Sequence, residues 1–64
     1  MKTYSIIKQE ECQGMTYYVF RGTNIQDVKE KDVAIGSTFF NISNSTLYGA
    51  YYESGVLKWK DLQV

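Results

Sequence analysis

The sequence contains no histidine and no proline, and Cys12 is its only cysteine. Without histidine the chain lacks the commonest general base and the nitrogen ligand of most zinc sites, and one thiol cannot form an internal disulfide. Linker-like, repeated and low-complexity segments are also missing, which is typical of one cooperative unit. We therefore expect residues 1–64 to form a single small globular domain without a metal site or a disulfide.

Net charge and long apolar runs are absent as well. Seven Lys and Arg residues balance seven Asp and Glu residues, so no long-range field attracts nucleic acid or anionic lipid. No window approaches the roughly 18 apolar residues of a membrane-spanning helix, and Lys8 interrupts the apolar start too soon for a secretion signal. We expect a soluble, cytoplasmic protein with no membrane partner.

Catalytic groups are scarce. Glu10 and Glu11 are adjacent, so their side chains point apart in an extended segment. Asp27 and Glu30 alternate with lysines, as on an ordinary solvated face. Glycine-rich phosphate loops, nucleophile elbows and metal-ligand spacings do not occur. We therefore expect that the protein is not an enzyme and that it has no catalytic residue, metal or cofactor.

Hydrophobic residues make up 44% of the chain and aromatic residues 16%, a composition typical of a folded protein. Residues 3–8 and 15–21 are rich in β-branched and aromatic types and flank a polar segment ending at Gly14, which predicts a first hairpin. Asn24 can cap a short helical turn in which Ile25 and Val28 share one face.

Three further strands are predicted over residues 36–42, 47–52 and 56–62, separated by turns rich in Asn, Ser and Gly. The predicted fold class is mostly β, at the margin of α+β. About five antiparallel strands would form a small barrel or a sheet meander, with one short helical turn between strands 2 and 3.

Matching of apolar residues across the turns predicts the strand register. A two-residue Asn44-Ser45 loop places Ile42 opposite Leu47. In the next hairpin, a two-residue Ser54-Gly55 loop would pair apolar with charged residues on both faces. A three-residue Glu53-Ser54-Gly55 loop instead places Tyr51 opposite Leu57 and Gly49 opposite Trp59, where the indole covers the missing side chain. We expect the three-residue loop.

This register divides the three C-terminal strands into two faces. The first face is apolar and holds Phe40, Ile42, Leu47, Tyr51, Leu57 and Trp59. The second face carries the candidate binding residues Phe39, Tyr48, Tyr52, Lys58 and Lys60, together with Asn41, Ala50 and Val56. It is too aromatic for a solvated face, because leaving a Phe exposed forgoes about 1.5–3 kcal/mol of burial. We expect something to cover it.

Three kinds of cover are consistent with the second face. The first hairpin could pack across it and close a small barrel or sandwich. A protein partner or a second copy could bind there, since aromatic patches mark contact sites. Single-stranded nucleic acid could stack on Tyr48 and Tyr52 beside Lys58 and Lys60, as on a small SH3-like or OB-like domain. Nucleic acid ranks below protein for two reasons. The net charge of the chain is zero, and lysines on an edge strand can simply oppose edge-to-edge aggregation.

The run Ile35-Gly36-Ser37-Thr38-Phe39-Phe40-Asn41, followed by Leu47-Tyr48, Gly55 and Trp59, resembles a β-hairpin unit of bacteriophage tail and fibre proteins. The resemblance covers residues 34–62. It implies a structural or binding role in phage-related material, or a small phage- or prophage-encoded protein that binds and inhibits a host protein. It carries over no catalytic residue. The sequence thus predicts a non-enzymatic protein-interaction module, with a nucleic-acid-binding domain as the alternative.

Overall fold

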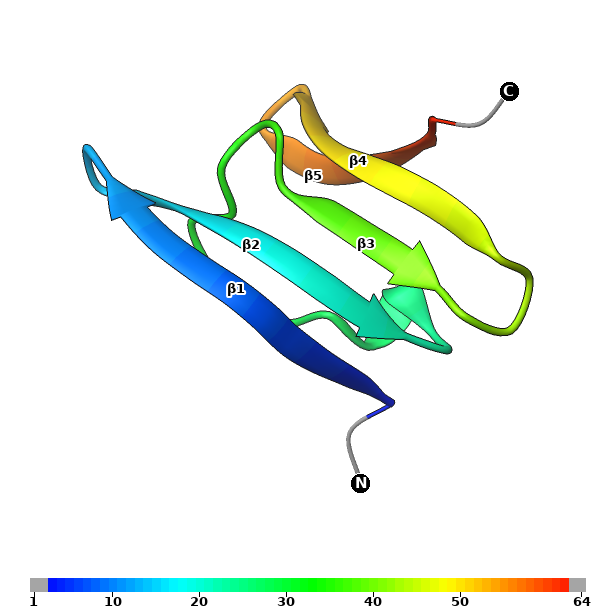
Figure 1. The fold of residues 1–64 in the computed structure, drawn as a ribbon. Helices are drawn as coiled ribbons and strands as arrows, with labels where there is room; N and C mark the ends of the chain where they lie inside the picture. The colour runs from blue at the N-terminus through cyan, green and yellow to red at the C-terminus, as the bar shows by residue number, and fades with distance from the viewer. Residues whose placement is uncertain (1–2, 63–64) are drawn as a thin grey trace.

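The computed structural model describes residues 3–62, which form one five-stranded sheet (Figure 1). In chain order the elements are β1 (Tyr4–Cys12), β2 (Met15–Gly22), the 3₁₀ turn η1 (Ile25–Asp27), β3 (Thr38–Asn41), β4 (Thr46–Glu53) and β5 (Val56–Asp61). The strands lie in the sheet in the same order. The predicted mostly β fold, with about five strands and one short helical turn, is confirmed.

The first hairpin closes through a two-residue turn. Gln13 and Gly14 have φ of 53° and 82°, and Cys12 pairs with Met15. Two residues with positive φ form the turn whose twist matches that of the flanking strands. The register shifts between Ile6 and Lys8, where β1 contains a bulge. The hairpin is confirmed, and its first strand runs four residues beyond the predicted end, from Lys8 to Cys12.

The crossover segment, residues 23–37, joins β2 to β3 and makes these two strands parallel. It runs behind the sheet in Figure 1. Asn24 caps η1 as predicted, since its side-chain oxygen accepts a hydrogen bond from the Gln26 backbone N–H at 3.1 Å. Only the β2–β3 pair departs from the predicted antiparallel pairing. The sheet is open at both edges, β1 and β5. A long connection permits a parallel pair that a tight turn cannot make.

The predicted β4–β5 register is wrong. The turn contains two residues, Ser54 and Gly55, with φ of 53° and 77°. Glu53 therefore pairs with Val56, and Trp59 pairs with Ala50 instead of Gly49. The positive φ at both turn positions matches the strand twist, and this match outweighs the mixture of charged and apolar neighbours that the register creates.

The predicted β3–β4 register is also wrong, by two residues. Phe40 pairs with Leu47, and Asn41 pairs with Thr46, so the loop holds four residues, 42–45, instead of two. The Asn41 side chain stabilises this wider loop, because its Oδ1 accepts hydrogen bonds from the Ser43 backbone N–H at 2.9 Å and from the Ser43 hydroxyl at 2.7 Å. Phe40 and Leu47 still share a face, as expected.

Aromatic side chains form the core on the inner face of the sheet. The inner face consists of Tyr18, Phe20, Phe39, Tyr48, Ala50, Tyr52, Leu57 and Trp59, with Tyr4 from β1. Phe20 and Phe39 are fully buried, and Trp59 meets both rings edge-on at centroid distances of 6.1 Å. Burial of each Phe stabilises the fold by about 1.5–3 kcal/mol.

The crossover segment covers this core and is held to the sheet by side-chain hydrogen bonds. The Tyr52 hydroxyl donates to the Val33 carbonyl oxygen at 2.6 Å, and Val33 is fully buried. At the β1 end, the Tyr4 hydroxyl donates to Glu30 Oε1, also at 2.6 Å. Of the three covers considered, the first hairpin is excluded, because it lies beside β3 in the sheet and the crossover segment packs over the core.

Candidate functional site

The structure separates the five predicted binding residues. Phe39 is fully buried, and Tyr48 and Tyr52 lie with it on the inner face beneath the crossover segment. Lys58 and Lys60 project from the opposite face, because they pair with Tyr51 and Gly49. The expectation that all five share one face is wrong, and its cause is the two-residue Ser54-Gly55 turn, which exchanges the faces of β5 relative to β4.

The opposite side of the sheet, here called the open face, carries no covering segment, and its centre is apolar. Its side chains come from all five strands: Ser5, Lys8, Glu10 and Cys12 of β1, Met15, Tyr17, Val19 and Arg21 of β2, Thr38 and Phe40 of β3, Leu47, Gly49, Tyr51 and Glu53 of β4, and Val56, Lys58 and Lys60 of β5. Tyr17 is 44% exposed and Tyr51 37% exposed. A solvated sheet face normally carries polar side chains at these alternate positions, so an apolar one indicates a contact surface.

A groove of about 740 Å³ crosses the open face. Its floor is made of small residues on neighbouring strands, Thr38 and Gly49, together with Gly36 in the crossover segment just before β3. Larger side chains line it above this floor, namely Ile35, Tyr51, Lys60 and Leu62. The groove is open to solvent along the sheet surface, so it suits a side chain laid into it from above.

Leu62 covers the floor where Trp59 was expected. A Cβ atom built on Gly49 would lie 3.0 Å from Leu62 Cδ1, so the leucine side chain rests on this glycine. Leu62 itself is 50% exposed, and its backbone N–H donates to the Leu47 carbonyl oxygen at 2.9 Å. The missing side chain at Gly49 is therefore compensated on the open face, by an aliphatic residue beyond β5.

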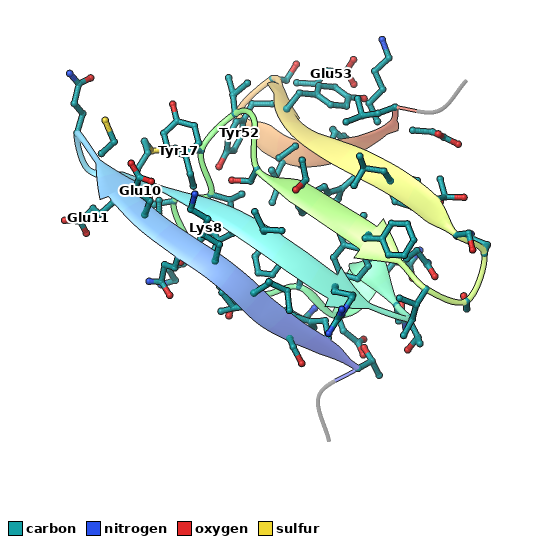
Figure 2. All side chains as sticks on the ribbon, in the orientation of Figure 1. Lys8, Glu10, Glu11, Tyr17, Tyr52 and Glu53 are labelled. Atoms are coloured by element: carbon teal, nitrogen blue, oxygen red, sulfur yellow. The ribbon has the colours of Figure 1, made fainter. Side chains whose placement is uncertain are left out.

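Four cations outnumber two carboxylates, Glu10 and Glu53, on the open face. Lys58 and Lys60 project from β5, and Arg21 lies on β2. Lys8 and Glu10 lie beside Tyr17 at the β1 edge, as Figure 2 shows. All these charged side chains are exposed, and they form a rim around the apolar centre. A neutral protein thus presents one locally cationic face, which favours a partner with carboxylates around an apolar contact.

One titratable group near the crossover has a shifted proton equilibrium. The hydrogen bond to Glu30, together with burial, raises the pKa of the Tyr4 phenol above its ordinary value of 10.0. Tyr4 is a buried inner-face residue, and its ring meets Phe20 edge-on at 5.6 Å. This arrangement fixes the crossover to β1 and has no contact with the groove.

Among residues 3–62, no three side chains of the types that ligate metals come together. The single helical element of the same residues is far too short to cross a membrane. No family model matches the chain, and the searches of curated proteins and of solved structures returned no match.

Sequence reasoning missed the groove residues Thr38, Gly49 and Leu62. In β2, Tyr17 and Val19 alternate with Tyr18 and Phe20. Both sets are apolar, so alternation alone does not say which set is covered. A two-residue turn at Ser54 and Gly55, with the glycine at a position of positive φ, places Lys58 opposite Tyr51 and Lys60 opposite Gly49.

Proposed function

We propose that this protein is a non-enzymatic protein-interaction module that binds its partner through the open face. The observation that carries the proposal is the groove, which is apolar at its centre and bordered by exposed cations. A small domain gains most stability by burying large apolar side chains, so retaining Tyr17, Tyr51 and Leu62 on the surface favours a binding role.

The chemistry of the groove defines the partner. Its apolar lining by Ile35 and Leu62 suits an apolar side chain, and Tyr51 offers a rigid aromatic contact of the kind enriched at hot spots. Lys60 at the groove and Lys58 next to it on the same face would pair with carboxylates that flank this anchor. We therefore expect a protein segment with an apolar anchor between acidic residues.

The resemblance of residues 34–62 to a phage tail and fibre unit agrees with a structural or binding role. We extend the proposal to phage- or prophage-encoded proteins that bind a host protein. A cytoplasmic location belongs to the same proposal. Neither extension alters the predicted partner chemistry at the groove.

A random-peptide library displayed on phage tests the proposal against the immobilised protein. Wild type should select peptides with an aromatic or aliphatic anchor and flanking Asp or Glu. Leu62→Ala and Tyr51→Ala should weaken binding of the selected peptides roughly tenfold or more, as for truncated hot-spot residues. Lys60→Glu should reduce the preference for acidic flanks.

Ile42→Ala is the matched control, because Ile42 is 51% exposed, like Leu62 at 50%, and lies in the β3–β4 loop away from the groove. Circular dichroism should show all variants folded. Equal peptide binding by Leu62→Ala and Ile42→Ala would contradict the assignment of the groove.

A second candidate function is supported by the same face. Tyr17 and Tyr51 are exposed aromatic rings on a sheet that also carries Lys58 and Lys60, an arrangement that can stack single-stranded bases and contact phosphates. A fluorescence titration with labelled oligo-dT and oligo-U across a salt series distinguishes the candidates. Micromolar affinity that falls steeply with salt would favour the nucleic-acid function over the protein partner.

A further inference from the structure

The two edge strands of the sheet differ in their charge pattern. β1 and β5 each have a single neighbour, so one row of backbone N–H and C=O groups on each faces outward. On β5, Lys58 and Lys60 are two residues apart on the open face. Antiparallel pairing of two β5 strands about Trp59 would place Lys58 opposite Lys60, which is a repulsive arrangement. This edge is protected against self-pairing.

The β1 edge has the opposite property. Lys8 pairs with Val19 and Glu10 with Tyr17, so both charged side chains project on the open face, two residues apart. Figure 2 shows Lys8 and Glu10 along one side of β1 and Glu11 on the other. Antiparallel pairing of two β1 strands about Gln9 would place Lys8 of each copy opposite Glu10 of the other. The edge is therefore self-complementary.

Other centres of pairing are unfavourable. A two-fold axis at Lys8, Glu10 or Glu11 places that residue opposite its own copy, so like charges meet. Two residues that oppose each other across the axis must project on the same face, so their numbers differ by an even number. The axis therefore passes through a residue and not between two residues. Among the charged stretch Lys8–Glu11, Gln9 alone combines opposite-charge pairs with an uncharged residue on the axis.

The backbone agrees with the same centre. Cys12 and Met15 close a two-residue turn, so they form a hydrogen-bonded pair within the hairpin. Alternation then directs the backbone groups of Glu10 and Lys8 toward β2, and those of Gln9 and Glu11 toward the outside. Two Gln9 residues on the axis can exchange both N–H···O bonds. Lys8 of one copy and Glu10 of the other then form a non-hydrogen-bonded pair, in which the side chains lie closer together than in a hydrogen-bonded pair.

We propose that two copies of this protein associate by antiparallel pairing of their β1 edges about a two-fold axis at Gln9. The bulge at Ile7 and the turn at Gln13 limit the ladder to a few residues, so the dimer is closed and weak. The axis is perpendicular to the sheet, and both open faces then lie on the same side of one continuous ten-stranded sheet. The interface is separate from the groove and does not depend on the partner proposed above.

Charge exchange on β1 tests the pairing by sedimentation equilibrium in the presence of a reductant. Wild type should show a concentration-dependent dimer. Lys8→Glu and Glu10→Lys should each raise the dimer dissociation constant roughly tenfold or more, because each turns both ion pairs into like-charge pairs. An equimolar mixture of the two variants should restore the dimer as a heterodimer, and the double variant K8E/E10K should restore it within one chain.

Lys31→Glu in the crossover segment is the control: Lys31 is exposed and lies outside both edge strands, so the same charge reversal there should leave the dissociation constant unchanged. Positions 8 and 10 are exposed, and dimerisation of the double variant also verifies that both substitutions permit folding. A wild type that stays monomeric at millimolar concentration would overturn the proposal. Single variants that dimerise as well as wild type, or a mass that grows beyond the dimer, would overturn it too. Peptide binding at the groove remains measurable in every variant, so the two proposals fail independently.

Discussion

Two glycines of the sheet show how local space decides the cost of a substitution. A Cβ on Gly22 would overlap the Thr3 carbonyl oxygen and lie 2.5 Å from Tyr4 Cβ, whereas a Cβ on Gly49 would meet only the flexible end of Leu62. We expect Gly22→Ala to lower the free energy of unfolding by about 3 kcal/mol and Gly49→Ala by less than about 1 kcal/mol. Urea denaturation measures both, and equal losses would contradict the close approach at Gly22.

The Tyr4 phenol makes the stability sensitive to alkaline pH. Its pKa is raised by the hydrogen bond to Glu30 and by burial, so the folded protein keeps the proton where the unfolded chain releases it. The stabilisation is therefore fully present below about pH 10 and is lost as the pH rises through the pKa of the folded state.

Tyr4→Phe removes this hydrogen bond to a carboxylate and should cost about 1.5 kcal/mol at neutral pH. The difference in unfolding free energy between wild type and Tyr4→Phe should shrink above pH 10. Chemical denaturation across a pH series measures it. A difference that stays constant with pH would contradict the raised pKa of the Tyr4 phenol in the folded state.

At the scale of elements, the β4–β5 hairpin can be tested by comparing its two faces. Trp59 contacts Phe20 and Phe39 on the inner face, while Tyr51 lies on the open face. We expect Trp59→Ala to lower the free energy of unfolding by about 2 kcal/mol or more, and Tyr51→Ala by less than about 1 kcal/mol. Similar losses in thermal or urea unfolding would support the three-residue turn, which places both on one face.

Strand positions and the capped turn at Asn24 could be predicted from the sequence because local propensity determines them. Pairing could not. The direction of β3 depends on where the crossover segment packs, and Val28 and Val33 carry no periodic signal that says which face of the sheet they cover. The β4–β5 register was predicted wrongly because cross-strand matching received more weight than the turn residues Ser54 and Gly55.

The candidate site shows the same limit. Phe39, Tyr48 and Tyr52 were correctly grouped on one face with each other, and this grouping follows from alternation within short strands. Whether these three side chains are exposed depends on the crossover segment, which packs over them only in the tertiary structure. The expected turn before β5 is one residue longer than the observed turn. A one-residue change moves every side chain of a strand to the other face, so the prediction places Lys58 and Lys60 on the wrong face.

At the scale of the whole molecule, the two sides of the sheet differ in what covers them. The crossover segment supplies a second layer over the inner face, and domains are generally stable with two such layers. The open face has no second layer among residues 3–62, although Phe40 and Leu47 at its centre are only half-buried. A bound partner would complete the missing layer, so binding should also raise the melting temperature, and at equal concentration a tighter partner should raise it more.

The parallel pairing of β2 and β3 also has a kinetic consequence. The β1–β2 hairpin and the β3–β5 segment are each local in sequence and can form within microseconds, but their junction requires closure of the crossover. Docking of the two halves along β2 and β3 should therefore limit the folding rate. We expect Phe39→Leu at this seam to slow refolding, and Leu57→Ala on β5 mainly to accelerate unfolding, in stopped-flow measurements.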